Sequence, residues 1–472
     1  MTDKVRRTPA LRVLPWTLGV LLTATACESY VADPLDFDEL VRGIAEDEAR
    51  VRARGRTGTD HVDTALTFES AYRSMLEFGP GITAARNELA RLEVIAEAGP
   101  RRPNPNFSGG PLALDGPGLT GVLRRGVQAT LSLALPLFGR IGAARDVDEA
   151  EVVASRVALE ARVLEDVYAL REDWIALVIT MRELELAEAA VKITQRIVQR
   201  TSIMVTEGVA NGIDLRTAEI DLTEATVERA RTRRSMLQIR GAIANRIGRP
   251  FAVTARIDST DLPALDTAGS SAVDVTPVVP TLSPDHPRLR ELAARYEVSE
   301  QKLRLEVAHQ YPDITLGPNY EREGKTDRYG LSLGINLPLF DQNQRAIADA
   351  KAERTTARAR YVAAMRELET GIERDHARLT VAREELTAAT EQKRAVTSLR
   401  ALARTSLEEG TIEPWRYLDA LRRYIAVARN ELVALRAIYD AELALERSSA
   451  TFRLAFESFH ESAEDTAEDV HR

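Results

Sequence analysis

The chain contains one sequence unit twice, and this duplication limits its possible folds more than any other feature. The phrase LPLF starts at Leu135 and again at Leu337, 202 residues later. Gly208 in TEGV and Gly410 in LEEGT are separated by the same 202 residues. Two upstream pairs recur in the same order, each with a spacing of 207 residues: Pro80 with Pro287, and Pro105 with Pro312. Four landmarks in one order indicate two repeats of one structural unit.

The repeats are expected to cover most of the chain. We place the first at residues 65–249 and the second at 285–455. The segment between them, 250–284, is rich in Pro, Ser and Thr, a composition typical of a linker.

Each repeat contains a short stretch of alternating apolar residues just before or within its LPLF phrase. In the second repeat these are Leu331, Leu333 and Ile335, separated by small or polar residues. A period of two predicts a strand with one apolar face, and the polar or glycine-rich loop before each stretch predicts a hairpin. Two interpretations fit such hairpins: a small sheet on a hydrophobic core, or closure with other subunits into a membrane barrel that leaves no edge strands.

Long helices should follow both LPLF phrases. No proline occurs between Pro136 and Pro250 or between Pro338 and Pro414. About 70 residues at 1.5 Å each give a rod of about 105 Å. Apolar residues recur every eleven positions, which keeps the apolar stripe almost straight along a helix: Val153, Leu164, Ile175, Leu186 and Ile197. The second repeat keeps this spacing only at Leu368 and Leu379. Each rod then reverses at glycine, and a second helix returns.

The first 26 residues have the pattern of a secretion signal, with a basic flank and an apolar stretch that ends in small residues. The sole cysteine, Cys27, follows directly. It is either the acylated first residue of a mature lipoprotein or an incidental cysteine after a cleaved signal. Residues 27–64 are expected to form an N-terminal periplasmic segment. With one cysteine the chain forms no internal disulfide.

Composition and motifs exclude several functional classes. The formal net charge of -9 gives no basic footprint for nucleic acid. The six histidines show no metal-ligand spacing, and we find no nucleophile elbow, phosphate loop or paired cysteine motif. We therefore expect no enzyme activity, no cofactor and no metal site. The acidic tail, 456–472, is expected to be disordered.

Two longer phrases carry a family resemblance: LPLFDQNQRAIADAKAER and LEEGTIEPWRYLDALRRYIAVARNEL. Together with the duplicated layout over roughly residues 65–455, they resemble the TolC-like outer-membrane efflux proteins. The resemblance implies a mainly α fold with a small β part. In it, long antiparallel helices form a trimeric α-barrel, and four strands per protomer enter a shared twelve-strand transmembrane β-barrel.

The same resemblance implies location, partners and assembly. The protein would be a homotrimer in the outer membrane of a Gram-negative-type bacterium, with a periplasmic extension. In the lipoprotein subtype it would be lipid-anchored through Cys27. A periplasmic adaptor, or membrane fusion protein, and an inner-membrane pump of the RND type would complete the export path.

The resemblance also assigns candidate site residues. Pro136 and Pro338 would mark the switch from membrane strand to periplasmic helix. The helix turns would meet the adaptor, and residues just after them would form the periplasmic gate. The turn candidates are Gly208, Gly212 and Gly410, and the gate candidates are Asp419, Arg416 and Asp214. The alternative for both carboxylates is that they only cap or solvate the starts of helices.

Several functions remain open at this level. Efflux of small molecules or metal cations is the first interpretation, and type I protein secretion is the second. A non-channel periplasmic adaptor or a coiled-coil scaffold would explain the helices. Neither explains two hairpins with matching proline switches.

Overall fold

The computed structural model describes residues 66–114, 124–136, 138–257, 282–323, 326–412 and 414–450, with a few positions between 30 and 46. The chain divides into two units, Met1–Thr64 and Ala65–Arg472. In the first unit, residues 37–39 and 41–43 are helical. The expected signal segment, Cys27 and the acidic tail lie outside the described residues.

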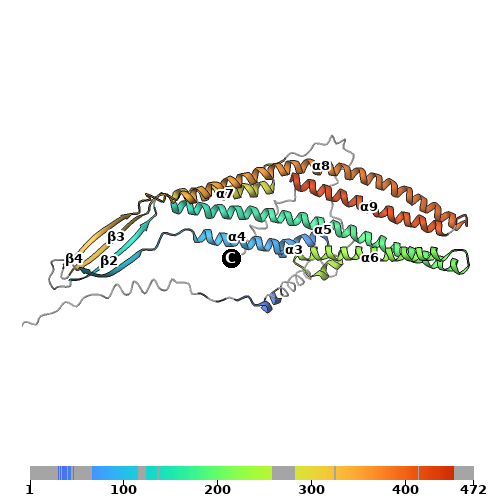
Figure 1. Cartoon of the computed structure of the whole chain (residues 1–472), viewed down its shortest axis with the longest axis horizontal. Coiled ribbons are helices and arrows are strands. Elements are labelled where there is room, and N and C mark those ends of the chain that lie inside the picture. The colour runs from blue at the N-terminus through green and yellow to red at the C-terminus, as the bar shows by residue number, and fades with distance from the viewer. Residues whose placement is uncertain are drawn as a thin grey trace, which may run out of the picture. The chain divides into compact units, whose positions relative to one another are not determined.

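The second unit repeats one order of elements: helix, two strands, long helix, returning helix (Figure 1). In the first repeat these are α3 (Phe68–Phe78), α4 (Pro80–Ala98), β1 (Asn106–Leu114), β2 (Arg124–Leu135), α5 (Arg140–Thr206) and α6 (Gly212–Arg246). In the second they are α7 (Pro287–Ala308), β3 (Ile314–Glu323), β4 (Thr326–Ile335), α8 (Gln344–Glu408) and α9 (Pro414–Ser449). The paired landmarks Pro80 and Pro287 each start a helix, where a missing N–H costs nothing.

The start of the expected linker is ordered against the first repeat. Phe251–Arg256 form a 3-10 helix, η2, and Ile257 bridges to Leu66. Ile257 is buried in the same apolar cluster as α3 and α5.

The two predicted hairpins join into one antiparallel sheet in the order β1-β2-β3-β4. The joint is the β2–β3 pairing, in which Leu133 lies opposite Leu316 and Thr130 opposite Asn319. Between these pairs the backbones approach so closely that a Cβ on Gly317 would lie 1.7 Å from the Leu131 carbonyl oxygen. Only glycine fits there, so this residue permits the hairpins to pair.

The long helices pack as two antiparallel pairs, α5 with α6 and α8 with α9, with α7 lying along both α5 and α8. The main apolar cluster is centred on α5, where Trp174 is fully buried and meets Phe68 edge to face at 5.7 Å. The predicted eleven-residue stripe is fully buried at Ile175, whereas Val153 is 53 % exposed in a single chain. Among the described helices, none has an apolar stretch long enough to cross a membrane.

Candidate channel-forming sites

One face of the sheet is apolar and exposed. The strand register aligns three pairs across β3 and β4: Ile314 with Ile335, Leu316 with Leu333, and Pro318 with Leu331. Leu331 and Leu333 are 71 % and 73 % exposed in the single chain. A contiguous exposed apolar surface of this kind marks contact with protein or membrane rather than water.

The opposite face carries small and polar side chains. The hydroxyl of Thr315 donates to the Gly334 carbonyl at 3.1 Å, and that of Ser332 donates to the Gly317 carbonyl at 2.8 Å. The sheet therefore separates an apolar side from a side that water can wet.

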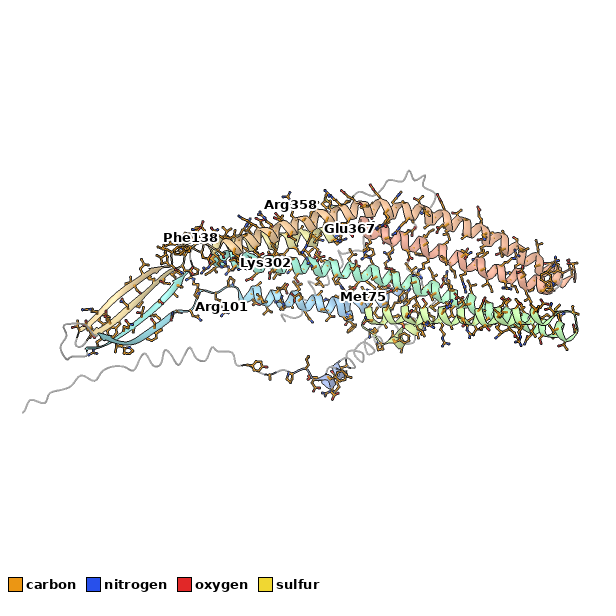
Figure 2. All side chains as sticks on the ribbon, viewed as in Figure 1. Met75, Arg101, Phe138, Lys302, Arg358 and Glu367 are labelled. Carbon is orange, nitrogen blue, oxygen red and sulfur yellow. The ribbon has the colours of Figure 1, made fainter. Side chains whose placement is uncertain are left out.

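Aromatic pairs lie at both ends of the apolar face. Near the β3–β4 turn, Tyr320 and Tyr329 meet with ring centroids 5.3 Å apart, and the Tyr320 hydroxyl donates to Asp327 at 2.8 Å. At the helical end, Phe138 stacks on Tyr311 at 4.8 Å, where the strands meet the helices (Figure 2). Apolar strands flanked by aromatic girdles are the pattern of an outer-membrane barrel wall.

The predicted strand-to-helix switches lie where β2 and β4 give way to helices. Pro136 directly follows β2, and Pro338 follows β4 after two residues. The change of direction between strand and helix uses residues with left-handed backbone conformation. Phe138 and Gly139 have φ of 62° and 75°, and Asn343 before α8 has φ of 62°.

Both switches are fixed to the second repeat. Arg140, the first residue of α5, donates to Asp313 at 2.6 Å, in a pair that is about one quarter exposed. The Asn343 amide donates to the carbonyl of Glu306 at 2.9 Å and to its carboxylate at 2.6 Å. These contacts hold the sheet against the ends of α5, α7 and α8.

The two helix turns close in the same way. Gly208 and Gly410 have φ of 74° and 72°, a conformation that favours glycine. The amide of each donates to a carbonyl three residues earlier at 3.1 Å. Gly212 is the first residue of α6 and is exposed. Beside the first turn, Val209 is 70 % exposed and Ile213 is 75 % exposed.

The three gate candidates are each engaged by a different neighbour. Asp214 forms a capping box with Asn211, whose side-chain oxygen accepts from the Asp214 amide at 3.0 Å. Asp419 pairs with Arg423 at 2.9 Å, and both side chains are about half exposed or more. The Arg416 guanidinium lies over the Trp415 ring at 5.3 Å. The structure thus gives Asp214 a capping role and does not pair Arg416 with Asp419.

Two ion pairs that sequence reasoning missed connect α6 with α9. Arg422 pairs with Asp221 at 3.2 Å, and Arg429 pairs with Glu228 at 3.4 Å. On each helix the residue of the second pair lies seven positions after that of the first, so the two pairs are about 10 Å apart along the helices. They border a cavity of about 630 Å³ between α5, α6 and α9. The seven-residue spacing of opposite charges on both returning helices was the available signal.

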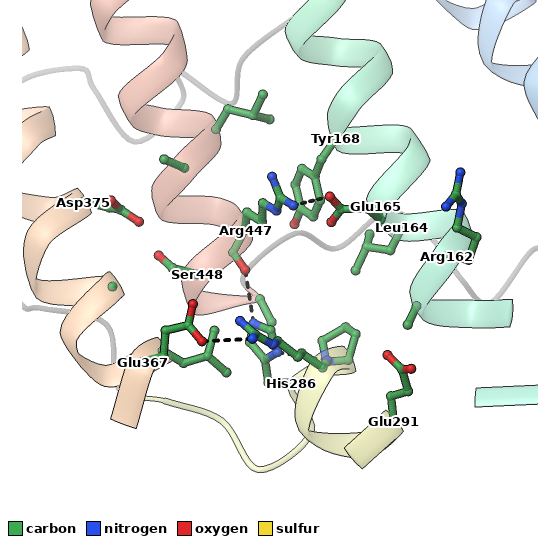
Figure 3. Close-up of a pocket in the computed structure, with 18 of the residues that line it drawn as sticks. Arg162, Leu164, Glu165, Tyr168, His286, Glu291, Glu367, Asp375, Arg447 and Ser448 are labelled. Atoms are coloured by element: carbon green, nitrogen blue, oxygen red, sulfur yellow. Dashed lines mark hydrogen bonds and ion pairs between the residues drawn. The ribbon is translucent and has the colours of Figure 1, made fainter. Parts of the chain in front are cut away.

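A larger cavity of about 950 Å³ lies among α4, α5, α7, α8 and α9 (Figure 3). Its walls hold Arg447, which pairs with Glu165, and the buried imidazole of His286. Sequence reasoning did not identify this cluster, because its members are separated by more than 100 residues. Within the described ranges, no three His, Cys, Asp or Glu side chains gather as metal ligands.

The sequence matches a profile described as Outer membrane efflux protein over residues 120–249 and 281–451. The match covers more than half of the chain in two segments, which confirms the internal duplication. The chain therefore belongs to the outer membrane efflux protein family. No significant match is found among curated protein sequences.

Solved channel structures share the fold. The outer membrane protein VceC from Vibrio cholerae superposes with a TM-score of 0.63 at 16 % identity, over 81 % of this chain and 95 % of that one. The outer-membrane channel OprN gives 0.62 at 18 % identity, over 82 % and 90 %. The MtrE outer membrane channel of Neisseria gonorrhoeae gives 0.59 at 19 % identity, over 81 % and 88 %.

These findings confirm the predicted fold class and the TolC-like resemblance. Family membership assigns the protein to the outer membrane and to efflux transport, and not to the enzymes.

Proposed function

We propose that the protein is the exit duct of a tripartite efflux pump and works as a homotrimer. The observation that carries this proposal is the exposed apolar sheet face, bounded by aromatic pairs at both ends, in a member of the outer membrane efflux family. Exposed leucines on a sheet are unfavourable in water but suit the hydrocarbon layer.

Closure of the barrel follows from the sheet edges. In the described part of the chain, β1 and β4 each pair on one side only. Pairing β1 of one copy with β4 of the next removes all edges once three copies form a ring of twelve strands. The small polar face then lines the lumen, and the apolar face meets lipid.

The helix turns are the proposed docking surface for a periplasmic adaptor, which links the duct to an inner-membrane pump of the RND type. Gly208, Gly212 and Gly410 shape these turns, and the exposed Val209 and Ile213 offer apolar contacts. Acylation of Cys27 would add a lipid anchor.

The gate is proposed at the start of α9 and its links to α6. Asp419 and Arg416 lie in the first two turns of α9, and Asp214 stiffens the start of α6 through its capping box. The two ion pairs from Arg422 and Arg429 hold the returning helices together at part-exposed positions. Such pairs contribute only about 0–1 kcal/mol each, so they can break and re-form as the helices shift.

The proposed cargo is small molecules or metal cations. An Asp419 ring from three copies would favour cations in the pore. The positive charges of its partner Arg423 and of the nearby Arg416 would weaken this cation preference. Changing Asp419→Ala is therefore expected to lower the cation-to-anion permeability ratio measured in planar bilayers.

A matched control removes the same charge elsewhere. Asp349→Ala, at an exposed position near the sheet end of α8, should leave the permeability ratio unchanged. An unaltered ratio in Asp419→Ala would reject the gate assignment while leaving the duct intact. Absence of any conductance from the wild-type oligomer would reject the duct itself.

A further inference from the structure

The buried histidine in the large cavity joins two helix ends. His286 is only 6 % exposed and is the N-cap residue of α7. Its Nδ1 accepts from the Arg288 amide at 3.1 Å, and its Nε2 lies 3.1 Å from the Arg447 carbonyl oxygen in the last turn of α9 (Figure 3). The imidazole therefore forms one hydrogen bond with each of two helix ends, through its two ring nitrogens.

The two partners fix the protonation state of the ring. An amide can only donate and a carbonyl can only accept, so Nδ1 carries no proton and Nε2 carries one. The ring is therefore neutral in this geometry. Both partners are groups that a helix leaves unpaired at its ends, an amide at the start of α7 and a carbonyl at the end of α9.

The charges around the ring do not favour an imidazolium. Carboxylates line the cavity from α5, α7, α8 and α9: Glu165, Glu172, Glu291, Glu367, Asp375 and Asp440. All except Glu172, which is exposed, already pair with an arginine: Glu165 with Arg447, Glu291 with Arg295, Glu367 with Arg288, Asp375 with Arg374, and Asp440 with Arg436. Arg162 from α5 also lines the cavity and is paired with Asp166 at 2.9 Å.

Protonation would break the joint on one side. A proton on Nδ1 would face the Arg288 amide donor to donor, and the helix cap would be lost. Burial lowers the pKa of His286 from 6.5, the nearby Arg288 charge lowers it further, and the hydrogen bond to Arg447 opposes the change.

The sign of the pH effect follows from that direction. The stabilisation is fully present above the ordinary histidine pKa of 6.5 and is lost as pH falls through the lower folded-state pKa.

We propose that His286 is a pH-operated latch between the start of α7 and the end of α9, closed while the imidazole is neutral. The opening is local, because other contacts continue to hold the end of α9. Arg171 pairs with Glu446 at 2.7 Å, and Arg447 pairs with Glu165. Protonation therefore releases the start of α7 from the imidazole, while the end of α9 keeps these contacts.

Hydrogen exchange of the full-length purified protein in detergent tests the latch. Protection factors, corrected for intrinsic exchange rates, are measured at pH 7.5 and 5.0 for a peptide covering residues 286–292. In the wild type the protection of this peptide should fall about fivefold at the lower pH, the size expected for loss of one helix N-cap.

Two variants distinguish the latch from general acid effects. His286→Asn keeps an uncharged N-cap acceptor and should show no pH-dependent fall in this peptide. His309→Asn, which removes an exposed histidine at the other end of α7, should retain the wild-type fall. Equal wild-type protection at both pH values, or the same fall in His286→Asn, would overturn the proposal. If His286→Asn does not assemble, His286→Ser supplies the same uncharged cap and the same comparison.

Discussion

The two long helices occupy equivalent places in the two repeats, yet their burial differs. In α5 a continuous run from Trp174 to Thr180 is buried, because α3, α4, α6, α7 and α9 surround it. In α8, which is described throughout, no residue beyond Ala382 is buried in the single chain. Among the described helices, α8 packs mainly against α9 and α7.

This difference shows that the first repeat holds the larger apolar core, whereas the second holds smaller clusters and leaves more of its long helix exposed. The first rod keeps the apolar period because its own chain packs around it. The second rod exposes Val381, Leu399 and Leu402 at 52 %, 43 % and 68 %. The proposed ring of three copies requires an open side of this kind.

The largest effect is expected in the core of the first repeat. Trp174→Ala removes the centre of the apolar cluster and should lower the free energy of unfolding by about 3–5 kcal/mol. Thermal unfolding followed by circular dichroism in detergent measures the loss.

The comparison variant lies on the open side of the second rod. Leu402→Ala should change the stability of isolated protomers by less than about 0.5 kcal/mol. A marked loss in protomers would contradict the division between core and surface. A loss confined to the assembled protein would show that another copy covers this side.

An intermediate effect is expected where the two repeats meet in the sheet. Gly317→Ala places a methyl group against the Leu131 carbonyl oxygen and should cost about 1–3 kcal/mol through overpacking. We expect less protein in the outer-membrane fraction. Gly110→Ala in β1 is the matched control, because its added Cβ would meet no atom within 4 Å. Equal yields from both variants would mean that the β2–β3 joint is dispensable.

The smallest effect separates the two helix turns. The first turn is stabilised by the helix that follows it, because Asn211 caps the start of α6. The second turn is stabilised by the helix that precedes it, because the Thr411 hydroxyl donates to the Ser406 carbonyl at 2.9 Å. Asn211→Ala should cost about 1 kcal/mol of stability, whereas Thr411→Ala should cost less. Denaturant titration ranks them, and the reverse order would refute the proposed difference.

Local patterns in the sequence were sufficient for most of the fold. Alternating leucines predicted the strands, and absence of proline predicted the rods. Glycine predicted the turns at Gly208 and Gly410, where positive φ is required. Each of these signals depends on neighbours within a few residues.

Long-range contacts were not predictable in this way. The pairing of β2 with β3 joins segments almost 200 residues apart, and no sequence pattern around Gly317 predicts it. The cap role of Asp214 had a local signal, Asn211 three residues earlier, and was one of the two interpretations left open. His286 precedes Pro287, which suggests a helix start, but its contact with Arg447 spans 161 residues.

The open edges of the four-stranded sheet have a consequence for biogenesis. A solitary protomer would carry two rows of unmet amides and carbonyls into hydrocarbon, where each such group costs several kcal/mol. For the proposed ring, insertion and association would therefore have to proceed as one event. The bilayer itself would then act as the checkpoint that rejects an incomplete ring.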